Sequence, residues 1–192
     1  MLWLVTGGVG CGKSAFAEEL AFTLGREGIK LFCPPFPALN ILDPLKGSEL
    51  RADFTWTYSD ADAFLADKLN AINLESNVFR ADRRVLVVDS LSGMLRLIIQ
   101  DTALDIVDGE ARIDALWQEV LTSILSFQGK IIVVTEETSA GLFLNSREQW
   151  YTFKLAAVNR ILSEASSSQY RLTAGVATEV KGYRVKRGER NS

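Results

Sequence analysis

The chain's clearest chemical signal is a glycine-rich stretch that could hold a series of linked phosphates. Residues 7–14 read Gly-Gly-Val-Gly-Cys-Gly-Lys-Ser, which fits the pattern G-x-x-x-x-G-K-[ST]. An apolar run over residues 2–5 precedes this stretch and predicts a buried strand. After it, Phe16, Leu20 and Leu24 recur on one helical face and predict a helix. A strand, a glycine loop and a helix in this order are the context that a phosphate-binding loop requires.

Such a loop binds phosphate mainly through its backbone. Glycines let consecutive N–H groups turn toward the phosphates, and the N-terminus of the following helix adds a favourable potential for an anion. Lys13 would neutralise the β- and γ-phosphates, and the Ser14 hydroxyl would bind Mg²⁺. The predicted nucleotide-binding residues are Gly7, Gly8, Val9, Gly10, Cys11, Gly12, Lys13, Ser14 and Ala15. The alternative, a glycine turn that binds no ligand, is disfavoured by the strand and helix around it.

A carboxylate for the same magnesium ion is expected at Asp89. It ends the apolar run over residues 85–88, which is typical of a parallel strand buried on both faces. The carboxyl ends of parallel strands form the ligand-binding edge of a sheet. The alternative role for Asp89 is the N-cap of the next helix, although Ser90 and Ser92 compete for that position.

Two further carboxylates, Glu136 and Glu137, follow the predicted strand over residues 131–135. They would therefore lie at the same edge of the sheet, where one of them could orient or deprotonate an attacking hydroxyl group. The alternative is a solvated pair in a loop, and the residues themselves do not decide between the two. Glu137 is the better candidate for reasons of resemblance given below.

Strand-like and helix-like runs alternate along the chain, which predicts an α/β fold with a mostly parallel central sheet and helices on both faces. The expected strands cover residues 2–5, 30–33, 84–89, 131–135, 170–174 and 179–180. Several breakers predict a long loop over residues 36–58.

The expected helices are marked by apolar periodicity and by caps. One follows an N-cap pair at Ser59 and Asp62, one covers residues 91–100, one covers about 113–124, and one follows a capping box at Ser146 and Gln149. The apolar face of the first consists of Phe64, Leu65, Leu69 and Ile72, and that of the last consists of Tyr151, Leu155, Val158 and Leu162.

Composition excludes several other classes of protein. Of 192 residues, 47% are hydrophobic, which is typical of a globular rather than a disordered chain. The net charge of −3 argues against a nonspecific nucleic-acid binder, which usually carries a basic surplus. No apolar run approaches the roughly 20 residues needed to span a bilayer. The glycine motif begins at residue 7, which leaves no room for a signal peptide, and Cys11 and Cys33 are expected as free thiols of a cytoplasmic protein.

We predict a single nucleotide-binding domain over residues 1–180 and a basic tail over residues 181–192. The tail contains Lys181, Arg184, Lys186, Arg187 and Arg190. A solvated, frayed terminus is the favoured interpretation of the tail, and a phosphate-contacting arm is the alternative.

With these pieces placed, the chain resembles the adenosylcobinamide kinase / adenosylcobinamide-phosphate guanylyltransferase family of cobalamin biosynthesis. Residues 4–8 and 12–14 look like that family's opening strand and phosphate loop. Residues 133–141 resemble its V-T-N-E-V-G-x-G element, with Thr135, Glu137 and Gly141 matching. Further similarities are Arg147, the Val-Asn-Arg of residues 158–160, the small-residue ending at 172–175 and a half-matched Trp-x-Thr element at 56–58.

The resemblance implies a RecA-like P-loop NTPase fold, often assembled as a trimer. It also implies two activities. In the first, a nucleoside triphosphate phosphorylates the aminopropanol hydroxyl of adenosylcobinamide. In the second, GTP donates GMP through a covalent histidine intermediate.

The chain departs from this family at the histidine. By resemblance the nucleophile would lie within residues 36–56, but the chain contains no histidine, so a phosphoramidate to imidazole cannot form. Lys46 in that segment is a poor substitute because an unperturbed lysine is protonated near pH 7. Phe153 also stands near a position where the family has an acidic residue. We therefore predict a kinase resembling adenosylcobinamide kinase that lacks guanylyl transfer.

The predicted catalytic residues are Lys13, Asp89 and Glu137, and the predicted metal ligands are Ser14 and Asp89. The predicted cofactor is Mg²⁺, with ATP or GTP as phosphoryl donor, a corrinoid as acceptor and a homo-oligomer, a trimer by resemblance, as the assembly. Two alternatives stay open: a P-loop kinase for another small hydroxyl substrate, and a nucleotide-binding switch or assembly protein without useful turnover.

Overall fold

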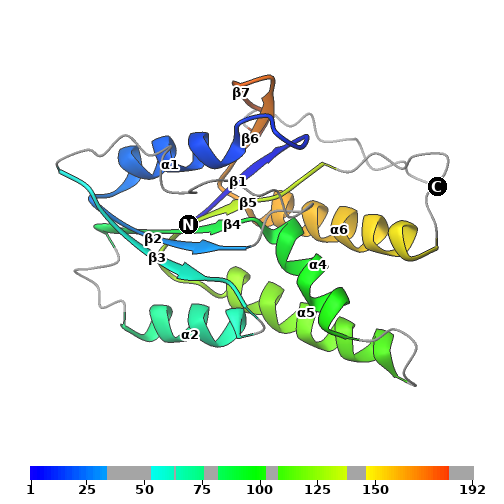
Figure 1. Ribbon diagram of the computed structural model, residues 1–192. Coiled ribbons are helices and arrows are strands. Elements are labelled where there is room, and N and C mark those ends of the chain that lie inside the picture. Colours follow the sequence, from blue (N-terminus) through cyan, green and yellow to red (C-terminus); the bar gives the residue numbers. More distant parts are fainter. Residues whose placement is uncertain (34–52, 63, 76–81, 103–107, 138–145, 182–192) are drawn as a thin grey trace, which may run out of the picture.

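A computed structural model describes residues 1–33, 53–62, 64–75, 82–102, 108–137 and 146–181. Its centre is a seven-stranded sheet with the strand order β3-β2-β4-β5-β1-β6-β7 (Figure 1). The strands are β1 (Leu2–Gly7), β2 (Glu27–Phe32), β3 (Thr55–Asp60), β4 (Arg84–Asp89), β5 (Lys130–Val134), β6 (Ser168–Thr173) and β7 (Val176–Glu179). All neighbouring pairs are parallel except β6 and β7. The predicted mostly parallel sheet is confirmed.

Helices cover both faces of this sheet, as predicted, but unequally. Of the helices in the described part of the chain, α1 lies on one face, and the other four lie on the opposite face (Figure 1). The helices are α1 (Lys13–Leu24), α2 (Leu65–Glu75), α4 (Leu91–Asp101), α5 (Gly109–Leu125) and α6 (Ser146–Ala165). Among the described residues, no helix is long and apolar enough to cross a membrane.

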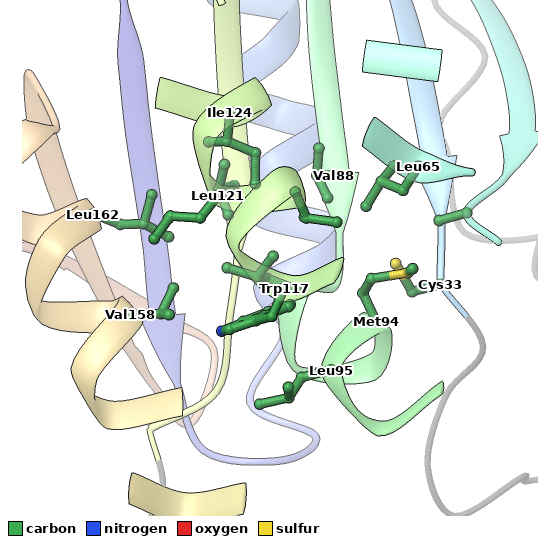
Figure 2. Packing of buried hydrophobic residues seen from close by; sticks show 14 of the residues in the cluster. Cys33, Leu65, Val88, Met94, Leu95, Trp117, Leu121, Ile124, Val158 and Leu162 are labelled. Carbon is green, nitrogen blue, oxygen red and sulfur yellow. The ribbon is translucent and has the colours of Figure 1, made fainter. Parts of the chain in front are cut away.

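Successive side chains of the central strands point to opposite faces of the sheet, so each face has its own hydrophobic cluster. In β4, Leu86 and Val88 belong to the cluster under the four helices, whereas Val85 and Val87 belong to the cluster under α1. Trp117 of α5 and Met94 of α4 pack in the larger cluster, close to Val88 in Figure 2. Because both faces are buried, the central strands are continuously apolar, which is the pattern that made them predictable.

The predicted long loop over residues 36–58 is wrong at its end, where β3 runs from Thr55 to Asp60 as an edge strand beside β2. Its pairing depends on a glycine in the neighbouring strand. A Cβ atom on Gly28 would lie 2.4 Å from the ring of Trp56, so only glycine leaves room for that indole. Residues 34–52 lie outside the described part of the chain.

The predicted N-cap pair of α2 is correct only for Asp62, whose Oδ1 accepts a hydrogen bond from the Phe64 N–H at 3.0 Å. Ser59 belongs to β3, so it does not cap α2, and Phe64 is 64% exposed rather than part of the buried face. Leu65 and Leu69 are fully buried, as expected. In α6 the whole predicted stripe is buried, and the side chain of Ser146 from the predicted capping box lies outside the described part of the chain.

Helix α1 approaches the sheet through small residues. Ala17 and Ala21 are fully buried, whereas Phe16 and Leu20 of the predicted face are only partly buried. Small side chains on the buried stripe let the helix axis lie close to the sheet. This close approach brings the N-terminus of α1 near the ends of the central strands.

The first residue of the predicted tail is anchored to the fold. Lys181 Nζ donates hydrogen bonds to the carbonyl oxygens of Ser163 at 2.7 Å, Glu164 at 3.0 Å and Ser166. An ammonium at this position satisfies carbonyl groups left free at the end of α6. Residues 182–192 lie outside the described part of the chain, so the domain boundary and the frayed tail remain predictions.

Candidate nucleotide site

The glycine-rich loop connects the end of β1 to the start of α1, as the sequence predicted. Gly10 and Gly12 adopt left-handed backbone conformations, with φ of 72° and 92°. A Cβ atom on Gly7 would lie 2.5 Å from the carbonyl oxygen of Leu172 and 2.7 Å from Cys11 Sγ. The Gly175 N–H donates to the Cys11 carbonyl at 3.1 Å, so the β6–β7 turn supports the loop from the side.

Lys13 is folded over this loop. Its side chain is buried, and its Nζ donates a hydrogen bond to the Gly8 carbonyl at 2.6 Å. The ammonium also lies 3.9 Å from Cys11 Sγ. Lys13 thus already sits where the loop would surround a phosphate, and its bond to Gly8 is one that a phosphate oxygen could replace.

The first turn of α1 is open to a ligand. Gly12 occupies the N-cap and provides no side-chain hydrogen bond, so no side chain caps the first N–H groups. Ser14 and Ala15 are exposed in this turn. An uncapped helix start with an exposed hydroxyl suits an anion together with its metal ion.

Asp89 ends β4 on the same face of the sheet as α1, because it continues the alternation of Val85 and Val87. It is 5% exposed. The alternative capping role is wrong, since Ser90 is the N-cap of α4 and its Oγ accepts a hydrogen bond from the Gly93 N–H at 3.2 Å. The carboxylate is therefore on the side of the sheet that α1 covers, and Ser14 lies in the first turn of that helix.

Asp89 has a partner that the sequence did not reveal. Its Oδ2 lies 2.9 Å from Lys30 Nζ, and the same ammonium lies 2.6 Å from Glu18 Oε1. Burial disfavours the charged ammonium, but the two carboxylates outweigh that cost and raise the pKa of Lys30 above its ordinary value. A lysine in the middle of the buried run of residues 29–33 was the available signal for this cluster.

Glu137 also lies beside the phosphate loop, and its N–H donates to the Gly7 carbonyl at 3.1 Å. Its carboxylate is engaged on both oxygens. Thr6 Oγ1 donates to Oε1 at 2.9 Å, and Arg171 lies 2.7 Å from Oε2. Each oxygen therefore already has one partner, and a lone pair stays on each for a further hydrogen bond.

The segment after β5 is tied to α6 through Asn159, one of the residues behind the family resemblance. Thr135 Oγ1 donates to Asn159 Oδ1 at 2.8 Å, and Asn159 Nδ2 donates to the Glu136 carbonyl at 2.8 Å. Asn159 therefore fixes the backbone that carries both glutamates. Residues 138–145, including the matching Gly141, lie outside the described part of the chain.

Arg147 joins α6 to α4 rather than to the phosphate loop, because its guanidinium donates to the Ile99 carbonyl at 3.2 Å. In the same region the Arg96 guanidinium lies 4.2 Å from the centre of the Tyr151 ring, and the Tyr151 hydroxyl donates to the Ser92 carbonyl. Burial raises the pKa of Tyr151 to about 12, so this phenol stays protonated at neutral pH.

The residues present fit a magnesium ion bound together with phosphates. No group of three or more histidine, cysteine, aspartate or glutamate side chains forms a metal cage within the described ranges. Mg²⁺ does not need one, since it usually takes one or two protein ligands and completes its shell with water and substrate phosphates. Ser14 and Asp89 would supply those ligands.

The two thiols are expected to differ in reactivity. Cys33 is 3% exposed and burial raises its pKa to about 12, whereas Cys11 is half-buried in the phosphate loop. We expect DTNB at pH 8 to modify Cys11 in the native protein and to leave Cys33 unmodified. MgADP or MgGDP should slow that reaction, and Cys11→Ser should remove it. Equal reaction of both thiols, or no protection by either nucleotide, would contradict the placement of Cys11 in the site.

A family model for cobinamide kinase / cobinamide phosphate guanyltransferase matches residues 51–180. The match runs from β3 to the end of β7 and includes Asp89 and Glu137. The glycine-rich loop lies before residue 51, so its interpretation as a phosphate-binding loop depends on its sequence and geometry. A search of curated proteins found no match. Because the family model covers more than half of the chain, we conclude that the chain belongs to the cobinamide kinase / cobinamide phosphate guanyltransferase family.

Proposed function

We propose that this protein is a nucleoside-triphosphate-dependent kinase that phosphorylates the aminopropanol hydroxyl of a corrinoid in cobalamin biosynthesis. The observation that carries the proposal is the placement of Lys13 and Asp89. One is folded over the phosphate loop, and the other lies at the end of β4 on the α1 side of the sheet. The residues proposed to bind phosphate and metal thus come from the same edge of the sheet, and membership of a kinase family supports a nucleotide there.

Each residue has a distinct task in this proposal. The loop N–H groups and the uncapped start of α1 bind the phosphates, and Lys13 exchanges the Gly8 carbonyl for a phosphate oxygen. Ser14 and Asp89 hold Mg²⁺, which when bound offsets the charge that develops on the transferring phosphoryl group. Glu137, held by Thr6 and Arg171, orients or deprotonates the acceptor hydroxyl through a remaining lone pair.

We propose that guanylyl transfer is absent, because the chain has no histidine to form the covalent GMP intermediate. The donor is ATP or GTP, and the proposed assembly is a homo-oligomer that does not bind nucleic acid. The two free thiols agree with a proposed cytoplasmic location.

One observation favours a second candidate, a nucleotide-binding switch without useful turnover. Both carboxylate oxygens of Glu137 are engaged by other side chains, and a switch needs no free base. A kinase for another small hydroxyl substrate is the nearer alternative. Nucleotide turnover measured with and without cobinamide distinguishes the three. Stimulation by cobinamide supports the corrinoid kinase, turnover without stimulation supports the other kinase, and tight binding without turnover supports the switch.

Asp89→Asn is expected to weaken the Mg²⁺-dependent turnover of the protein much more than it weakens folding. The change removes the carboxylate charge but keeps the size of the side chain, and Lys30 retains its second partner, Glu18. A magnesium titration of turnover, compared with thermal unfolding, measures both effects. The matched control is Ser90→Ala, which removes the α4 cap, costs about 1 kcal/mol of stability and should leave the titration unchanged. An unchanged titration for Asp89→Asn would exclude Asp89 as a metal ligand.

A further inference from the structure

A buried ionic cluster includes Asp89, one of the two proposed magnesium ligands. It consists of Glu18 from α1, Lys30 from β2 and Asp89 from β4. The side chains of Lys30, Glu18 and Asp89 are 8%, 13% and 7% exposed. Two carboxylates share one ammonium, so the cluster carries a formal charge of −1. Neither Glu18 nor Lys30 has a role in the proposed transfer.

The cluster adjoins the metal site through two elements. Glu18 follows Ser14 by four residues, so both side chains project from the same face of α1, one turn apart. Asp89 is paired with Phe32 across the sheet, and Lys30 lies two residues before Phe32 on β2. The Lys30 side chain therefore reaches along the sheet beneath α1 to the carboxyl end of β4.

This arrangement places a permanent positive charge beside a candidate metal ligand. Lys30 engages Oδ2 of Asp89, and the second oxygen, Oδ1, is not part of that ion pair. Solvent screens a buried cation only weakly. The Lys30 ammonium therefore reduces the attraction of Asp89 for a second cation. It also restricts the orientation of the carboxylate, since the ammonium is itself held by Glu18.

We propose that Lys30 is a positioning residue that fixes Asp89 and sets the charge of the magnesium site, so that Mg²⁺ binds together with nucleotide phosphates rather than before them. This inference rests on the proposed nucleotide site. In the protein without nucleotide, Lys30 supplies the positive charge that Asp89 and Glu18 require. When the triphosphate brings its own negative charge, the site becomes able to hold Mg²⁺ as well.

The test measures how strongly Mg²⁺ and nucleotide assist each other's binding. Calorimetry gives the affinity for ADP and for GDP, each in Mg²⁺ and in EDTA, and the ratio of the two affinities is the magnesium coupling. Three variants change the cluster charge in defined steps. Lys30→Met makes it −2 and Glu18→Gln makes it neutral. The double variant Glu18→Gln/Lys30→Met restores −1 without an ion pair, and it is the matched control.

We expect Lys30→Met to lower the magnesium coupling by roughly ten-fold, because Mg²⁺ then also binds the protein without nucleotide, and Glu18→Gln to raise it by a similar factor. The double variant should lie near the wild type. A merely structural Lys30 would instead lower nucleotide affinity equally in Mg²⁺ and in EDTA, leaving the ratio unchanged, and that result would overturn the inference. If Lys30→Met does not fold, the magnesium coupling of Glu18→Gln is compared with that of the double variant, which tests the same dependence on cluster charge. Absence of nucleotide binding by the wild type would contradict the proposed function instead.

Discussion

A Lys13→Ala enzyme is expected to lose most of its phosphoryl transfer, with kcat/KM falling by roughly a thousand-fold, or about 4 kcal/mol of transition-state stabilisation. In the proposed function, the ammonium folded over the loop neutralises the β- and γ-phosphates. Its loss leaves the developing charge of the transfer to the backbone and the metal alone. Steady-state kinetics with the best acceptor, together with thermal unfolding of the variant, measures the effect.

The matched control is Lys154→Ala. Lys154 also forms a short polar contact, an ion pair with Asp114, but it joins α6 to α5 on the other face of the sheet. An exposed pair of this kind contributes roughly 0–1 kcal/mol to stability and should not affect turnover. A folded Lys13→Ala protein with nearly wild-type turnover would contradict the catalytic interpretation of the glycine-rich loop.

Incubation with GTP and Mg²⁺ is expected to leave the protein without a covalently bound GMP. A guanylyl carrier needs a nucleophile that attacks the α-phosphate at neutral pH and then leaves again. Imidazole does both because its pKa lies near 7, and this chain has no histidine. Intact-protein mass spectrometry detects an acid-labile GMP adduct directly, and a family member that has the histidine serves as the positive control.

Phosphoryl transfer to the acceptor should proceed in the same sample in which the adduct is absent. A stoichiometric GMP adduct would contradict the kinase-only proposal. It would point to Lys46 or Ser48, in the segment where the resemblance expects the histidine. Substitution of each residue would then identify the nucleophile.

Local sequence patterns determined the parts of this protein that local physics controls. The buried central strands were predictable because both faces of a parallel strand are apolar, as in β4 and β5. The phosphate loop was predictable because its glycines, Lys13 and Ser14 are adjacent in the sequence. The position of Asp89 at the end of its strand followed from the same reasoning, whereas the family was expected from the resemblance of several motifs.

Tertiary structure alone decided the features that depend on partners distant in sequence. Strand β3 pairs with β2 where Trp56 packs over Gly28, a contact between residues far apart in the sequence. Glu137 looked like a free base, yet Thr6 and Arg171 engage it across the sheet. Lys30 was predicted only as the first residue of a strand over residues 30–33, yet it is the cation that Asp89 and Glu18 share. The energy of a buried charge depends on which charges surround it, and only the folded chain brings those charges together.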